Sequence, residues 1–156
     1  MEKQYPDTPR VIIWPPLLFL LMVGSGVGLH FRSPMTLPFH GPLRVVGGLL
    51  AAVAGIVAIW ARLVMKQAGT NVRPDRPTTA VVTAGPFGFT RNPLYLSLCL
   101  LNLALGLILA DIWLIVTTAI MAVVLQWGVI SREERYLEAK FGEVYVAYRK
   151  RVRRWL

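Results

Sequence analysis

Three short segments of this 156-residue chain carry the polar and aromatic side chains that could perform chemistry. The first is Gly85-Pro86-Phe87-Gly88-Phe89-Thr90-Arg91-Asn92-Pro93-Leu94-Tyr95, the second is the acidic pair Glu133-Glu134, and the third runs from Phe141 to Arg149. A cation, a carboxamide, an aromatic ring and a carboxylate that converge on one cleft would suit a small polar ligand beside a lipid-soluble one. Whether they converge depends on the elements that carry them.

Each segment also has a simpler structural interpretation. The pairs Gly85-Pro86 and Asn92-Pro93 are typical of turns, and Arg91 could anchor a helix end at a membrane interface. The pattern Ser131-x-x-Glu134 fits a capping box at the start of a helix. Taken singly, these features leave both interpretations open.

Two other kinds of site are not expected. The glycines Gly24, Gly26 and Gly28 follow no predicted strand and lie in an apolar run, so helix packing is favoured over a dinucleotide site. The chain has no Cys–His or Glu-x-x-His pattern for zinc, and we expect no metal.

The composition predicts an all-α integral membrane protein with a single domain. Apolar residues make up 55% of the chain and charged residues only 16%, and the charges are concentrated in short stretches. Apolar runs of about 20 residues predict membrane spans. We expect four spans at about 11–31, 43–65, 94–109 and 112–130, a connector at 66–92, and an amphipathic helical tail at 131–156. Asp111 would mark a tight turn between the third and fourth spans.

The basic residues predict the topology. With four spans, one side of the membrane holds the connector, the tail and the N-terminal segment, whereas the other side holds only Arg32 and Arg44 among the arginines and lysines. The positive-inside rule then places both termini and the connector in the cytoplasm, at the inner membrane if the source is bacterial. The net charge of +9 is explained by contact with anionic membrane lipids, and nucleic acid is not an expected partner.

The predicted arrangement brings the candidate groups together. Arg91 and Tyr95 begin the third span and Glu133 follows the fourth. Because these two spans would form a hairpin, both ends should meet at one membrane depth. Ionisable groups at such a depth are candidates for function.

The segment from about Gly69 to Arg153 resembles the membrane methyltransferase superfamily that includes isoprenylcysteine carboxyl methyltransferase and the phospholipid N-methyltransferases. That superfamily carries G-[PVY]-[YF]-x-x-x-R-[HN]-P-x-Y, then an acidic pair, then F-G-x-x-Y-x-x-Y. Residues 85–95, Glu133-Glu134 and 141–148 match these features in order. The resemblance implies an S-adenosylmethionine-dependent methyltransferase that acts on a lipophilic or lipid acceptor.

The resemblance also implies roles for individual residues. Arg91 is the arginine of the superfamily motif and would hold a carboxylate of cofactor or substrate through its planar guanidinium. The cofactor would contact nine residues: Ala80, Val81, Val82, Phe87, Asn92, Pro93, Leu94, Tyr95 and Glu133. Independently of the resemblance, an amine acceptor would have to lose a proton, and Glu133 or Glu134 would then be the base.

Two departures bear on the acceptor. Asn92 replaces the histidine of the prenylcysteine enzymes, and Val129 replaces an arginine that precedes their acidic pair. Arg132 is then the nearest candidate for substrate binding.

The main alternative to a methyltransferase is a non-enzymatic membrane scaffold or subunit. A transporter is disfavoured because the spans hold few polar residues. The acceptor, the methylated atom and the oligomeric state are left open.

Overall fold

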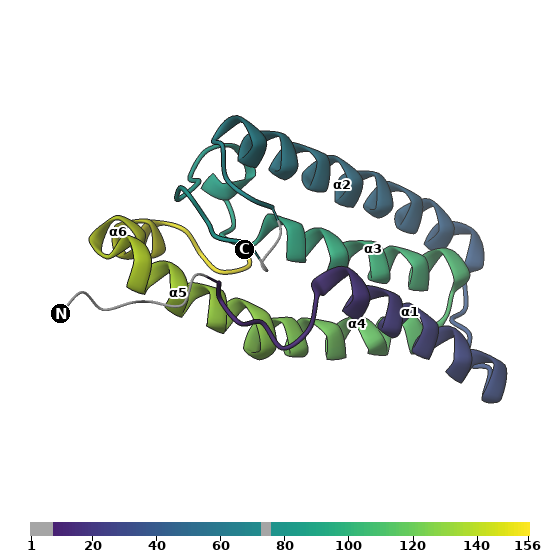
Figure 1. Ribbon diagram of the computed structural model, residues 1–156. Helices are drawn as coiled ribbons and strands as arrows, with labels where there is room; N and C mark the ends of the chain where they lie inside the picture. Colours follow the sequence, from purple (N-terminus) through teal and green to yellow (C-terminus); the bar gives the residue numbers. More distant parts are fainter. Residues whose placement is uncertain (1–7, 73–75) are drawn as a thin grey trace.

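The structure is a computed structural model that describes residues 8–72 and 76–156. Within these ranges the regular elements are helices and no strand forms, which confirms the all-α prediction. The long helices are α1 (Pro15–Arg32), α2 (His40–Gln67), α3 (Pro93–Leu109) and α4 (Ile112–Val124), and they lie alongside one another (Figure 1). The shorter elements are η1 (Gly85–Gly88), η2 (Leu125–Ile130), α5 (Ser131–Phe141) and α6 (Glu143–Arg151).

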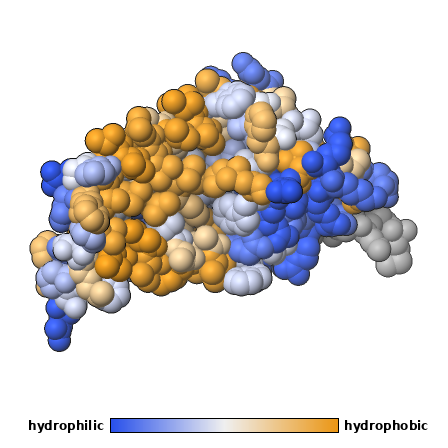
Figure 2. Space-filling view, turned by 180° about the vertical axis from the view of Figure 1, so that it is seen from behind, coloured by the Kyte–Doolittle hydropathy of each residue, from blue (hydrophilic) through white to orange (hydrophobic). Residues whose placement is uncertain are grey.

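Three to four of these helices can span a membrane. The segments Pro15–Arg32, His40–Gln67 and Ile112–Phe141 are long and apolar enough, and α3 is apolar but has 17 residues. Apolar side chains cover much of the helical surface, and hydrophilic ones gather at the end that carries α5 and α6 (Figure 2). The apolar part of the 30-residue helix ends at Ile130, so α5 extends beyond a hydrocarbon core that accommodates about 20 residues. Four crossings remain a prediction.

A glycine brings α2 against α3. A Cβ atom added at Gly47 would lie 2.8 Å from the backbone oxygen of Ala104 and 2.8 Å from a side-chain carbon of Ile108. The same test at Gly48 and Gly55 finds nothing within 4 Å, so only Gly47 of these three glycines provides close approach. Small residues at helix interfaces permit such packing in membranes.

Asp111 lies at the junction of α3 and α4, as the sequence predicts. Its Oδ1 accepts hydrogen bonds from the backbone N–H groups of Trp113 at 2.7 Å and Leu114 at 3.3 Å, and this caps α4. Its other oxygen lies 2.6 Å from Nδ1 of His30 in α1. Together these contacts satisfy a buried acid at the end of the bundle away from α5.

The tail differs from the predicted single helix over 131–156. Gly142 adopts φ +52°, which divides the tail into α5 and α6. After Arg151 the chain is no longer helical and returns to the start of α3 (Figure 1). The capping-box interpretation of Ser131 is also wrong, because α4, η2 and α5 run on as one helix and the Ser131 hydroxyl donates to the carbonyl of Gln126 at 2.7 Å.

Candidate active site

A cavity of about 120 Å³ lies where the first turns of α3 and α5 meet the connector. All nine residues predicted to contact a cofactor line it: Ala80, Val81, Val82, Phe87, Asn92, Pro93, Leu94, Tyr95 and Glu133. Arg91 and Glu134 line it as well. The structure therefore brings together the three segments that the sequence singled out, because α3 begins beside the point where α5 leaves the bundle.

The apolar wall comes from the connector and α6. The 3-10 turn η1 presents Phe87, which is buried, and the Tyr148 hydroxyl donates to the backbone carbonyl of Phe87 at 2.8 Å. Gly85 begins this turn with φ +60°, and a Cβ there would lie 2.9 Å from Val64. Through Tyr148, the segment from Phe141 to Arg149 thus holds the segment from Gly85 to Tyr95 in place.

Arg91 supplies the buried cation of the site. Its Nη2 lies 3.1 Å from Oε1 of Glu134, and both side chains are only 9% exposed. Its Nε and Nη1 are also buried, and neither has a hydrogen-bond partner within the described part of the chain. Leaving such donors unsatisfied is costly. The arrangement therefore suits a ligand with acceptor oxygens beside Arg91.

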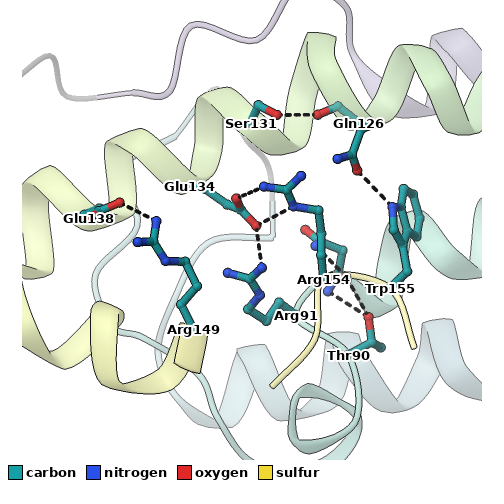
Figure 3. A network of polar contacts seen from close by, with 10 residues as sticks. Thr90, Arg91, Gln126, Ser131, Glu134, Glu138, Arg149, Arg154 and Trp155 are labelled. Carbon is teal, nitrogen blue, oxygen red and sulfur yellow. Dashed lines mark hydrogen bonds and ion pairs between the residues drawn. The ribbon is translucent and has the colours of Figure 1, made fainter. Parts of the chain in front are cut away.

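Glu134 has a second cationic partner in Arg154. The Nε of Arg154 donates to Oε1 of Glu134 at 2.9 Å, and its Nη2 pairs with Oε2 (Figure 3). Both carboxylate oxygens of Glu134 are thus engaged by guanidinium groups. This arrangement suits a structural anion better than a base, because a base needs an oxygen free to accept a proton.

Glu133 is in a different environment from its neighbour. Its Oε1 accepts a hydrogen bond from the Tyr95 hydroxyl at 2.6 Å. Burial raises the pKa of Glu133 to about 7, the Glu134 carboxylate raises this pKa too, and the hydrogen bond from Tyr95 lowers it. A carboxylate that titrates near neutral pH can exchange protons with a bound acceptor.

The C-terminal segment holds Asn92 and Arg91 in place through hydrogen bonds to its backbone carbonyls. The side-chain amide of Asn92 donates to the carbonyl of Arg154 at 2.9 Å, and the backbone N–H of Arg91 donates to the carbonyl of Arg153 at 3.0 Å. The Thr90 hydroxyl also donates to the Arg154 carbonyl, at 3.1 Å (Figure 3). Sequence reasoning missed Arg154, since nothing distinguishes it from the other basic residues near the C-terminus.

Arg132, predicted to bind substrate, lies outside this cavity. It lines a separate, open hollow with Arg10 and Arg135, and its Nη1 donates to the carbonyl of Arg10 at 3.5 Å. Successive side chains of an α-helix point about 100° apart. Because Glu133 and the next residue, Glu134, both face the cavity, Arg132 on the other side of Glu133 is directed away from it, and its predicted role gains no support from this geometry.

Comparison with known proteins agrees with the motifs. Residues 43–144, more than half of the chain, match the phospholipid methyltransferase family. The chain belongs to this family. The family is part of the superfamily of isoprenylcysteine and phospholipid methyltransferases, which confirms the resemblance drawn from the sequence, and it indicates a membrane methyltransferase.

A relative from Haemophilus influenzae, described as an uncharacterized protein, is 44% identical over 63 residues. The match covers 40% of this phospholipid methyltransferase family member and the whole of the relative. No solved structure matches the chain.

Proposed function

We propose that the protein transfers a methyl group from S-adenosylmethionine to a lipophilic acceptor at the cytoplasmic face of the membrane. The observation that carries this proposal is the pair of buried Arg91 nitrogens that have no hydrogen-bond partner among residues 8–72 and 76–156, in a cavity that Glu133 and Tyr95 also line. Family membership favours the reaction class, and the cavity geometry supports the site.

The residues present fit the methyl donor. Ala80, Val81 and Val82 offer an apolar stretch for the adenosyl group, Phe87 offers an aromatic surface, and Arg91 offers buried N–H groups that can donate to carboxylate oxygens. Ligand sites usually have volumes of about 300 Å³ or more. Because this cavity is smaller and partly open, the bound molecule would extend through its mouth. When bound, S-adenosylmethionine supplies a methyl group that its sulfonium charge already activates.

The protein's own residues then position the acceptor and handle its proton. Alignment of reactants and exclusion of water are the main contributions that such a site makes. For an amine acceptor, Glu133 is the base, because it forms no ion pair with the residues that the structure describes and its pKa is close to neutral. A carboxylate or thiolate acceptor needs no base. Glu134 holds Arg91 and takes no proton.

The distribution of charged and apolar residues supports access of ligands to the cavity from the cytoplasm and from the lipid bilayer. The cavity lies at the end of the bundle where α5, α6 and the connector carry most of the basic residues, which the positive-inside rule assigns to the cytoplasm. The helices next to it present apolar side chains outward. We therefore infer that both termini lie in the cytoplasm and that the acceptor enters the cavity from the inner leaflet.

Two measurements on the purified protein test this function. Calorimetric titration should detect binding of S-adenosylmethionine, and no heat at millimolar ligand with folded protein would favour a membrane scaffold instead. Incubation of a membrane lipid extract with a methyl donor carrying an isotopic label, followed by mass spectrometry, should reveal a labelled lipid-soluble product. Its mass would identify the acceptor class, and its fragmentation pattern would identify the methylated atom.

A further inference from the structure

The C-terminal residues after α6 contact the active site without lining it. None of the described residues 152–156 borders the cavity, yet the backbone of Arg153 and Arg154 accepts hydrogen bonds from Arg91 and Asn92, which do. The indole N–H of Trp155 donates to Oε1 of Gln126 at 2.9 Å and fastens the segment to η2. The segment thus forms an outer layer behind two functional side chains.

Arg154 and Arg91 share one carboxylate in an unequal way. Arg154 contacts both oxygens of Glu134, whereas Arg91 contacts only Oε1, through Nη2 (Figure 3). An arginine and a carboxylate usually prefer a bidentate pair with two parallel N–H···O bonds. Glu134 makes such a pair with Arg154, so it is not free to make one with Arg91.

This division leaves donors of Arg91 available. Its Nε and Nη1 are buried and have no partner in the described residues, although a carboxylate lies within reach of the same guanidinium. If Arg154 did not hold Glu134, that carboxylate could turn to face Arg91 and occupy two of its donors. A ligand carboxylate would then compete with Glu134 for the same nitrogens.

We propose that Arg154 is a positioning residue that keeps Glu134 from occupying the ligand-binding donors of Arg91. The proposal rests on the proposed function, since it assumes that Arg91 receives the carboxylate of the methyl donor. Arg154 also adds a second positive charge beside one acidic partner, which makes the surroundings of Arg91 more favourable for an anion.

The side-chain role can be separated from the backbone role. The hydrogen bonds from Thr90 and Asn92 go to the carbonyl of Arg154, which an alanine substitution retains. Arg154→Ala therefore removes the side-chain contacts with Glu134 and preserves the hydrogen bonds from Thr90 and Asn92 to the backbone carbonyl of residue 154. Glu134 keeps Arg91 as a partner in that variant, so no buried charge is left unpaired.

The test is calorimetric binding of two ligands that differ in the carboxylate. S-adenosylhomocysteine carries the amino-acid group of the methyl donor, and 5′-methylthioadenosine lacks it. We expect Arg154→Ala to weaken S-adenosylhomocysteine binding by about tenfold, the scale of a hydrogen bond to a charged group, and to leave 5′-methylthioadenosine binding unchanged. Arg151→Ala, which removes an exposed charge at the end of α6, should affect neither ligand.

The double variant Arg154→Ala with Glu134→Gln distinguishes a role of Arg154 in positioning Glu134 from a purely structural role. Removal of the competing carboxylate should restore S-adenosylhomocysteine affinity. No restoration in a double variant that still binds 5′-methylthioadenosine, or equal weakening of both ligands by Arg154→Ala, would overturn the proposal. If Arg154→Ala does not fold, Arg154→Lys replaces it, since lysine keeps the charge without the fork and should give a smaller, carboxylate-dependent loss. Wild-type protein that binds neither ligand would instead contradict the proposed function.

Discussion

The Tyr95 hydroxyl lies 2.6 Å from Oε1 of Glu133 and joins the first turn of α3 to the first turn of α5. The two residues are 38 positions apart in the sequence, and both line the cavity. This hydrogen bond gives Glu133 a neighbour that favours its charged form, against the effect of burial. It therefore links the geometry of the site to its expected dependence on pH.

Tyr95→Phe should move the pH dependence of methyl transfer to an amine acceptor toward higher pH. The hydrogen bond from Tyr95 lowers the pKa of Glu133, so its loss raises that pKa further above its ordinary value. The base form would then appear only at higher pH. Initial rates from pH 5 to 9 in wild type and variant measure the change, and identical profiles would show that Tyr95 does not tune Glu133.

Glu133→Gln and Glu134→Gln should have different effects on catalysis. In wild type, the rate with an amine acceptor should rise as pH increases through about 7, because Glu133 must lose its proton to act as base. Glu133→Gln should lower kcat by about 10²–10⁴-fold and remove this rise. Glu134→Gln should retain the rise, since Glu134 takes no proton. A lost rise in the Glu134 variant would reverse the assignment.

Arg91→Lys should weaken binding of the methyl donor while the protein stays folded. Lysine keeps a charge near Glu134 but lacks the fixed, planar set of N–H donors that a guanidinium presents. We expect a Kd for S-adenosylmethionine at least about tenfold higher, measured by calorimetry. Arg91→Ala should abolish turnover. Normal turnover in a folded Arg91→Ala protein would rule out the role assigned to this residue.

Glu133 should make stability depend on pH even without ligand. Its pKa is raised from 4.5 to about 7 by burial, so the folded protein binds this proton more tightly than the unfolded chain. The contribution is fully present below 4.5 and is lost as pH rises through about 7. Glu133→Gln should therefore raise the thermal unfolding midpoint relative to wild type at pH 8 and change it little at pH 4.5, in the same detergent. An equal shift at both pH values would show that the substitution acts through packing.

Gly47→Ala should destabilise the protein, whereas Gly48→Ala should not. The added methyl group at Gly47 would lie 2.8 Å from the backbone of Ala104 in α3, and overpacking of this kind costs about 1–3 kcal/mol. At Gly48 the space is open, and alanine gains about 0.5–1 kcal/mol from its helix preference. Thermal unfolding in detergent measures both. Similar midpoints for the two variants would contradict the close contact between α2 and α3.

Much of the fold follows from local sequence. Apolar runs place α1 to α4 close to their observed positions, since helices in lipid must satisfy their own backbone hydrogen bonds. Asp111 marks the junction of α3 and α4 because its side chain caps the following helix. The break at Gly142 was missed, since an amphipathic pattern continues across it and only the backbone reveals the positive φ.

The sequence by itself determined which residues form the candidate site: the nine cofactor-contact positions, Arg91 and the acidic pair belong to motifs that local residue types make visible. Only the tertiary structure decided how the two acids differ and which tail arginine matters. Glu133 and Glu134 are adjacent in sequence, yet helical rotation turns one toward Tyr95 and the other toward Arg91 and Arg154. Arg154 reaches Glu134 through a chain reversal after α6, and contacts between distant segments of this kind leave no periodic signal in the sequence.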